Sequence, residues 1–374
     1  MAPPAKIWEK GSDFLGKAKD YFGKKQQPPP LLSERTAVLC AVLFTFLYIA
    51  PFYLSNALRS SPTNSRDSPA VIKARVRAVV LTSLASAAIT IYILTTHGHA
   101  GPRDVLRLFA IWPINPMDCV KVLALVCLLF TGPLYELLIA QGSWRNIGPF
   151  SMKATIWDSW IGFRNYLFGP WFEELVFRSL VVSLYLLAKV SPTRIVLTSP
   201  LVFGAAHFHH YIEFVHTRTP AGRKMPPLKV LLLGLVPTAF QFAYTSLFGV
   251  FAAFVYLRTG NVFTCGLAHM FCNYMGLPRV WGRVGQFTDF EPHEVTPDVA
   301  QGKRHNLDQV KGGHSLTKDV GKNEQKAGEV VHAGMKDLGV AWTVIYYVLL
   351  PTGAYGFYRL LWPLTQSENA LATF

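Results

Sequence analysis

The sequence predicts an all-α, polytopic membrane protein, a bundle of about eight transmembrane helices around a central polar cavity. Of its 374 residues, 51% are hydrophobic and only 16% are charged, and the mean hydropathy is +0.27. The hydrophobic residues gather in runs long enough to cross a bilayer, which takes about 20 residues. Several ionisable side chains lie inside these runs, where only a protein interior or a water-filled cavity tolerates them.

Charge is distributed unevenly along the chain. The net charge of +14 would suggest nucleic-acid binding in a soluble protein, but here the basic residues lie in the connections between hydrophobic runs. Attraction to anionic lipid head groups and the positive-inside bias explain that placement. We therefore expect the lipid bilayer as a partner and no nucleic acid. The basic loops and the basic N-terminal segment favour opposite orientations, so the sidedness stays open.

The chain divides into four regions. Residues 1–35 are basic, with apolar residues on one helical face, which favours an interfacial amphipathic helix over a loose tail. Residues 36–281 form the membrane-embedded domain, residues 282–338 a polar flexible loop, and residues 339–374 the last helix and C-terminal tail. The expected spans are residues 36–58, 78–96, 119–140, 171–188, 194–215, 230–257, 262–277 and 340–361.

The fourth expected span contains the most unusual residues of the chain, Glu173, Glu174 and Arg178. Each charge at bilayer depth costs roughly 2.5 to 3.5 kcal/mol on the milder scales. Glu174 and Arg178 are four residues apart and share a helix face, so they can pair, either to fix helix packing or to support a site. Glu173 is turned about 100° away, and we expect a functional role for it.

Further polar side chains lie on the fifth and seventh expected spans. His207 lies within the fifth, with two more histidines closer to its end, and His269 and Asn273 share one face of the seventh. A bundle that brings these helices together with the fourth would supply the parts of a hydrolytic site. Glu173 with His207 can activate water, and His269 with Asn273 can donate to a tetrahedral oxyanion.

Two other chemistries stay open at this point. Glutamate and histidine also bind catalytic zinc, but the HExxH motif is absent and the spacing is not distinctive, so we expect no metal and no cofactor. The five cysteines lie in or at the ends of apolar segments and are expected to be free, buried thiols. Cys272 and Cys265 lie close to the polar residues of the seventh span, although a thiolate in lipid needs a lowered pKa.

Taken in order, these motifs resemble the Abi (CPBP) family of intramembrane proteases. The motifs are Glu173-Glu174-x-x-x-Arg178, then Phe203-x-x-x-His207, then His269-x-x-x-Asn273. The strings around the first two motifs are similar to those of the type II CAAX prenyl endopeptidases, the Ras-converting proteases of the endoplasmic reticulum. The motifs span residues 172–273, about a quarter of the chain.

The resemblance implies an endopeptidase that removes the last three residues of a prenylated CAAX terminus, after the isoprenyl-cysteine. It implies that Glu173 and His207 activate water, that His269 and Asn273 form the oxyanion site, and that Glu174, Arg178 and Phe203 support them. Prenylated CAAX proteins such as Ras-like small GTPases would be the substrates, in a multi-pass protein of the endoplasmic reticulum membrane. A proton-coupled transporter and a non-catalytic membrane scaffold are the alternatives.

Overall fold

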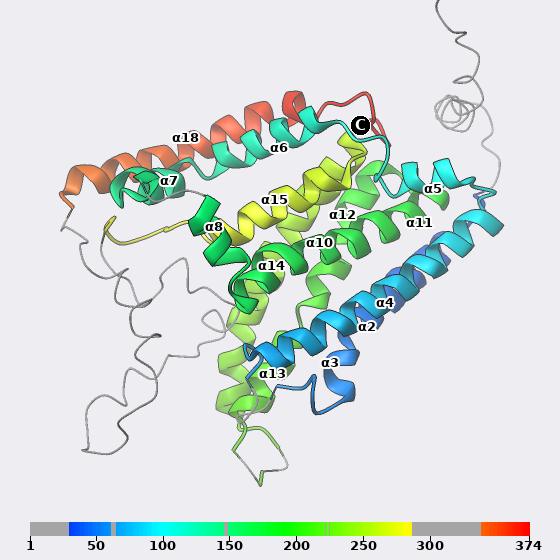
Figure 1. Ribbon diagram of the computed structural model, residues 1–374, viewed down its shortest axis with the longest axis horizontal. Helices are drawn as coiled ribbons and strands as arrows, with labels where there is room; N and C mark the ends of the chain where they lie inside the picture. The colour runs from blue at the N-terminus through cyan, green and yellow to red at the C-terminus, as the bar shows by residue number, and fades with distance from the viewer. Residues whose placement is uncertain (1–29, 61–64, 146–148, 221, 224, 286–337) are drawn as a thin grey trace, which may run out of the picture.

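The computed structural model describes residues 30–60, 65–145, 149–220, 222–223, 225–285 and 338–374. All regular secondary structure in these ranges is helical (Figure 1), as the sequence predicts. Residues 1–29 of the predicted interfacial segment 1–35 lie outside the described residues. The same holds for residues 286–337 of the predicted polar loop 282–338.

The first two long helices of the described chain pack side by side. They are α2 (Glu34–Ile49) and α4 (Pro69–Thr96), and the short helix α3 (Pro51–Leu54) lies between them in the sequence. Serine caps begin both long helices, because the Ser33 and Ser68 hydroxyls accept hydrogen bonds from backbone amides in the first turn. At 28 residues, α4 is about 42 Å long, enough to cross a bilayer.

The third expected span is not one straight helix. Helix α6 (Pro116–Leu129) is followed by a bend of 82°, after which α7 (Thr131–Leu134) and the π-helical η2 (Tyr135–Ala140) continue in a new direction. The sequence explains the bend, since Pro133 lacks an amide hydrogen and its ring clashes with the carbonyl four residues earlier. Helix α6 packs against α18 (Val340–Leu364) and α15 (Val262–Met275), and α6 and α18 run together along one edge of Figure 1.

The helix that carries the two glutamates lies in the centre of the bundle. It comprises α10 (Gly169–Glu174), the π-helical η5 (Leu175–Leu180) and α11 (Val181–Leu187), without a break in the chain direction. Nearly every side chain after Glu174 in this run is buried, which agrees with its apolar sequence on all faces. Upstream, α8 (Pro149–Ile156), α9 (Trp160–Gly162) and the π-helical η4 (Phe163–Phe168) lead into it.

The fifth expected span is also interrupted, at His207. Helix α12 (Pro192–Ala206) ends there, and α13 (His209–Arg218) begins two residues later. The imidazole Nδ1 atoms of His207 and His209 lie 3.0 Å and 2.7 Å from the carbonyl oxygens of Phe203 and Ala206. Histidine side chains near a helix C-terminus stabilise it by binding its last carbonyl groups, so the break follows from the His207-Phe208-His209 sequence.

The long stretch after the fifth span is one helix, α14 (Leu228–Thr259), with Pro237 inside it. It turns into α15 at Gly260, which has a left-handed φ of 55°, and Asn261 caps α15 through its side-chain oxygen. Helix α15 then approaches α10 closely, because a Cβ atom at Gly266 would lie 2.6 Å from the Trp171 ring. Glycine at this position therefore allows the two motif-bearing helices to meet.

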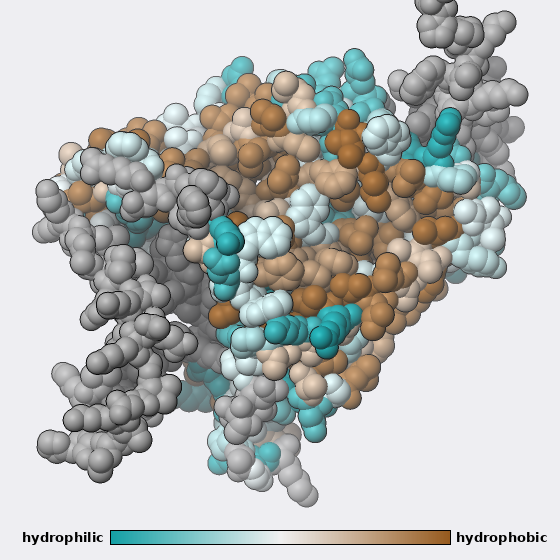
Figure 2. All heavy atoms as spheres, in the orientation of Figure 1, coloured by the Kyte–Doolittle hydropathy of each residue, from teal (hydrophilic) through white to brown (hydrophobic). Residues whose placement is uncertain are grey.

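Among the described residues, three helices are long and apolar enough to cross a membrane, namely α4, α14 and α18, and the bent pair that begins at α6 makes a fourth if counted as one span. Large apolar side chains on α2 and α4 point outward, including Leu39, Phe46, Leu81 and Leu84. Figure 2 shows apolar side chains over the middle of one face and polar ones mainly at its margins. The protein is an all-α polytopic membrane protein, while the expected count of about eight spans stays a prediction.

Candidate active site

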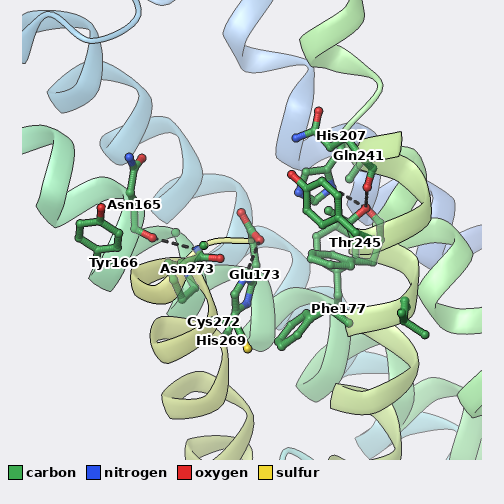
Figure 3. Close-up of a pocket in the computed structure, with 18 of the residues that line it drawn as sticks. Asn165, Tyr166, Glu173, Phe177, His207, Gln241, Thr245, His269, Cys272 and Asn273 are labelled. Carbon is green, nitrogen blue, oxygen red and sulfur yellow. Dashed lines mark hydrogen bonds and ion pairs between the residues drawn. The ribbon is translucent and has the colours of Figure 1, made fainter. Parts of the chain in front are cut away.

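A large cavity of about 840 Å³ lies between α10, α12, α14 and α15. All four residues predicted to be catalytic, Glu173, His207, His269 and Asn273, contribute to its wall, and Figure 3 shows their side chains around a shared space. They come from three helices that are far apart in the sequence. The predicted convergence of these polar side chains on a single chamber is therefore present in the structure.

Glu173 and His269 face each other across the contact between α10 and α15. Oε2 of Glu173 lies 3.7 Å from Nε2 of the imidazole, and Glu173 is 22% exposed. On its other side, the same imidazole makes a 2.7 Å hydrogen bond from Nδ1 to Oε1 of Glu174. A carboxylate oxygen only accepts, so Nδ1 is the donor, and this bond fixes the ring orientation that presents Nε2 to Glu173.

Glu174 and Arg178 form the ion pair that their spacing predicts. Nε of Arg178 lies 3.1 Å from Oε2 of Glu174, and the two side chains are 2% and 0% exposed. A buried charge of this kind requires a partner, since its desolvation is not otherwise offset. Arg178 also lies over the ring of Phe203 at 4.4 Å, and this cation–π contact joins the buried ion pair to a residue of the cavity wall.

These contacts form a continuous polar chain from a sealed interior to the cavity. It runs from Arg178 through Glu174 and His269 to Glu173. The first two members do not contribute to the cavity wall, whereas the last two do. The arrangement lets buried groups orient an imidazole that reactants can reach.

His207 contributes to the cavity from the C-terminal end of α12. Its Nδ1 lies 3.0 Å from the carbonyl oxygen of Phe203, which can only accept, so Nδ1 carries the hydrogen. In the neutral ring Nε2 is then an unprotonated acceptor. The sequence paired His207 with Glu173, but the imidazole directly beside Glu173 is that of His269.

Asn273 lies one helical turn beyond His269 on α15, as their four-residue spacing predicts. Its side-chain amide donates a 3.0 Å hydrogen bond to the backbone carbonyl of Asn165, shown as a dashed line in Figure 3. Asn165 belongs to η4, and sequence reasoning did not single it out. No sequence signal marked it, because backbone carbonyls are present at every residue.

Three more polar residues of the cavity wall escaped the sequence analysis: Gln241, Tyr244 and Thr245 on α14. Gln241 and Thr245 are a turn apart, and the Thr245 hydroxyl donates to the Gln241 carbonyl at 2.8 Å. These residues interrupt a long helix that is apolar enough to cross a membrane. The criterion that found the histidines, a polar group inside an apolar run, would have found them as well.

The structure also places the residues on which a thiol or a metal mechanism would depend. All five cysteines are free; Cys272 contributes to the cavity wall, while Cys265 is buried outside it. Over the part of the chain that is described, no three histidine, cysteine or acidic side chains are grouped as ligands of one metal ion. The metal and thiol hypotheses are therefore left to direct measurement.

Comparison with known proteins identifies the family. A family model described as Type II CAAX prenyl endopeptidase Rce1-like matches residues 155–275, the segment that holds all three motifs. The probable CAAX prenyl protease 2 of Schizosaccharomyces pombe is 33% identical over 248 residues, which cover 66% of this chain and 83% of that protein. The human CAAX prenyl protease 2 is 33% identical over 247 residues, covering 64% of this chain and 71% of the human protein.

A third relative, the CAAX prenyl protease 2 of Saccharomyces cerevisiae, is 28% identical over 268 residues, covering 64% of this chain and 79% of the yeast protein. No solved structure matches the chain. The matches to the fission yeast and human proteins cover most of their length, and the family model covers Glu173, His207, His269 and Asn273. The chain belongs to the type II CAAX prenyl endopeptidase family.

Proposed function

We propose that this protein is an intramembrane endopeptidase that removes the C-terminal tripeptide from prenylated CAAX proteins, after the isoprenyl-cysteine. The observation that carries the proposal is the convergence of two acid–base groups and two potential donors on one cavity within a membrane-embedded bundle. The names of the relatives support the substrate class. The wider attribution to Ras-like small GTPases and to the endoplasmic reticulum membrane belongs to the same proposal.

In the proposed mechanism, Glu173 is the general base. It accepts a proton from water, whose oxygen attacks the scissile carbonyl carbon, and the Nε2 acceptor of His207 orients that water. The proton on Glu173 then passes to the nitrogen of the departing tripeptide as the carbon–nitrogen bond breaks. Atoms and charge balance without any further reactant.

The oxyanion of the tetrahedral intermediate is stabilised by His269 and Asn273. As an imidazolium, His269 donates from Nε2 while Glu174 holds Nδ1, and the Asn273 amide donates from one turn away. Donors that are already oriented stabilise developing charge strongly, because they need no rearrangement during the reaction. Glu174 and Arg178 keep His269 in position from behind the cavity wall, and Phe203 supports Arg178 from within that wall.

Part of the cavity wall suits the isoprenyl chain. This part is apolar and comes from α6, α14 and α18, with the side chains of Val126, Leu129, Phe251, Phe254, Phe357 and Leu361. Burying a prenyl chain contributes about 0.8 kcal/mol for each methylene group. A substrate that is anchored in the bilayer can therefore bind through its lipid while its peptide reaches the polar centre.

The experiment is a cleavage assay on the purified protein in detergent, with a farnesylated CAAX peptide and mass-spectrometric detection of the tripeptide. We expect release by the wild type, loss in Glu173→Ala and His207→Ala, and retention in Cys272→Ala. Undiminished release by Glu173→Ala contradicts the assigned role, and loss in Cys272→Ala supports a thiol mechanism. Activity that a chelator abolishes and zinc restores would assign the reaction to a metal.

The same preparation separates the enzyme from the other classes of function. In proteoliposomes, a proton-coupled transporter would acidify the lumen under a substrate gradient, and a scaffold would neither transport nor cleave. Absence of tripeptide release from several prenylated peptides, combined with proton flux, overturns the proposed function.

A further inference from the structure

The segment that leads into the two glutamates contains a backbone carbonyl group that its own helix leaves available. In the π-helical η4, carbonyl groups accept hydrogen bonds from amides five residues later, and the Gly169 amide accordingly donates to the Arg164 carbonyl. The next such bond would join the Asn165 carbonyl to residue 170, which is a proline and has no amide hydrogen. The Gly169 amide, which would reach Asn165 in an α-helix, is already bound to Arg164.

The Asn165 carbonyl is bound from α15 instead. The side-chain amide of Asn273 donates to it at 3.0 Å, as Figure 3 shows. The next residue of each segment also meets its counterpart, because the rings of Tyr166 and Tyr274 make a T-shaped contact with centroids 5.7 Å apart. Asn165, Asn273 and the buried Pro170 all contribute to the cavity wall. The proline and the proposed oxyanion donor therefore meet at the same carbonyl group.

This hydrogen bond selects one of the two orientations of the Asn273 amide. Its nitrogen carries two hydrogens, whereas its oxygen can only accept. With the nitrogen toward Asn165, one hydrogen is bound and the second is available to an oxyanion. A flipped amide would place two acceptor oxygens against each other, which is repulsive. The Asn165 carbonyl thus fixes which end of the asparagine side chain it faces.

We infer that Pro170 is a positioning residue for the proposed reaction: because it lacks an amide hydrogen, it keeps the Asn165 carbonyl available to orient Asn273. The inference rests on the proposed function, in which Asn273 donates to the oxyanion, and adds to it the backbone group that holds this donor. Donors contribute most when they are oriented before the reaction begins. Since Pro170 and Glu173 both belong to α10, one helix carries the proposed base and sets the orientation of the donor.

The test is Pro170→Ala in the full-length protein, purified in detergent and assayed for tripeptide release from a farnesylated CAAX peptide. Alanine supplies the missing amide hydrogen, so the helix can bind the Asn165 carbonyl and turn it along the helix axis, away from α15. We expect kcat to fall about 10-fold, less than on removal of the donor itself, with KM and the melting temperature little changed. An unchanged kcat overturns the inference and leaves the proposed function intact, whereas absence of cleavage by the wild type overturns both.

Coupling to Asn273 separates positioning from a general structural effect. In the Asn273→Ala background, Pro170→Ala should cause no further loss, because the carbonyl then has no amide to orient. A merely structural role would lower kcat by the same factor in both backgrounds, and that outcome contradicts the inference.

Pro237 provides a matched control, because it is a proline inside α14 that lies outside the cavity wall. Pro237→Ala should leave kcat unchanged. A loss equal to that of Pro170→Ala would attribute the effect to helix prolines in general and would contradict the inference.

Two backbone esters, introduced with α-hydroxy acids, test the hydrogen bond itself. The hydroxy-acid analogue of alanine at position 170 lacks the ring but also lacks the amide hydrogen, so kcat should return to the wild-type value. The analogue of tyrosine at position 166 converts the Asn165 carbonyl into an ester carbonyl, a weaker acceptor, and should lower kcat as Pro170→Ala does. If Pro170→Ala does not fold, this second ester decides the question. A kcat that stays low with the first ester, or is unchanged with the second, overturns the inference.

Discussion

Glu173 and Glu174 are neighbours in the sequence, but the helix places them in opposite environments. Glu173 contributes to the wall of an 840 Å³ cavity and is 22% exposed, whereas Glu174 is 0% exposed and bound to Arg178 and His269. One carboxylate is thus reachable by substrate, and the other is sealed behind the imidazole that both contact. This difference in burial predicts different roles. Loss of Glu173 should affect the reaction alone, whereas loss of Glu174 should affect both the reaction and the stability of the fold.

The largest effect on activity is expected from Glu173→Gln. The amide keeps the shape of the side chain but cannot accept a proton, so kcat should fall on the order of 10³-fold to 10⁴-fold. Because Glu173 is not sealed, thermal unfolding should shift little. Tripeptide release and circular dichroism melting on the same preparation measure both quantities. A large loss of thermal stability would mean that Glu173 is structural, like its neighbour.

Glu174→Ala should destabilise the protein by about 3 to 5 kcal/mol, because it leaves Arg178 buried without its ionic partner. Activity should fall too, since His269 loses the bond that orients it. The double variant Glu174→Leu with Arg178→Met removes both charges and should regain much of the stability but none of the activity. Denaturant unfolding in detergent checks this, and a double variant no more stable than Glu174→Ala would contradict the pairing.

Asn273→Ala should remove one oxyanion donor and lower kcat about 10²-fold to 10³-fold. The side chain lies in the cavity wall and donates a hydrogen bond to the Asn165 carbonyl near the protein surface, so stability should change little. Single-turnover cleavage separates this effect from substrate binding, because the prenyl contacts are unchanged. A raised KM with unchanged kcat would indicate that Asn273 only positions the peptide.

The smallest effect is expected at the exposed pair of Glu34 and Arg194. These side chains are 42% and 61% exposed, and surface pairs contribute about 0 to 1 kcal/mol. Glu34→Gln should therefore leave cleavage unchanged and lower the melting temperature only slightly, with added salt reducing even that difference. An effect comparable to that of Glu174→Ala would show that burial does not govern the strength of ion pairs in this bundle.

Local helix geometry explains why much of the candidate site was predictable. The pairing of Glu174 with Arg178 and the stacking of His269 with Asn273 depend only on a four-residue spacing, which any helix converts into a shared face. The membrane-protein class follows from the hydrophobic runs alone, because their length matches the bilayer. These features required no knowledge of how the helices pack.

Contacts between distant segments were not predictable in the same way. The expected straight spans 119–140 and 194–215 are bent or broken, at Phe130 and at His207. The sequence contains the proline and the histidines responsible, but hydropathy averages over them. Such a break depends on the hydrogen bonds of one or two backbone groups, and the average hydropathy of about 20 residues carries no information about them.

The sequence by itself determined an α-helical membrane protein of the prenyl endopeptidase family and the side chains that carry its motifs. Only the tertiary structure decided that His269 rather than His207 lies against Glu173, and that residues from three distant helices line one cavity. The physical reason is that spacing along one helix fixes a face, whereas the partner of that face depends on the packing of the whole bundle. At Gly266, for example, the missing side chain sets how closely α10 and α15 approach.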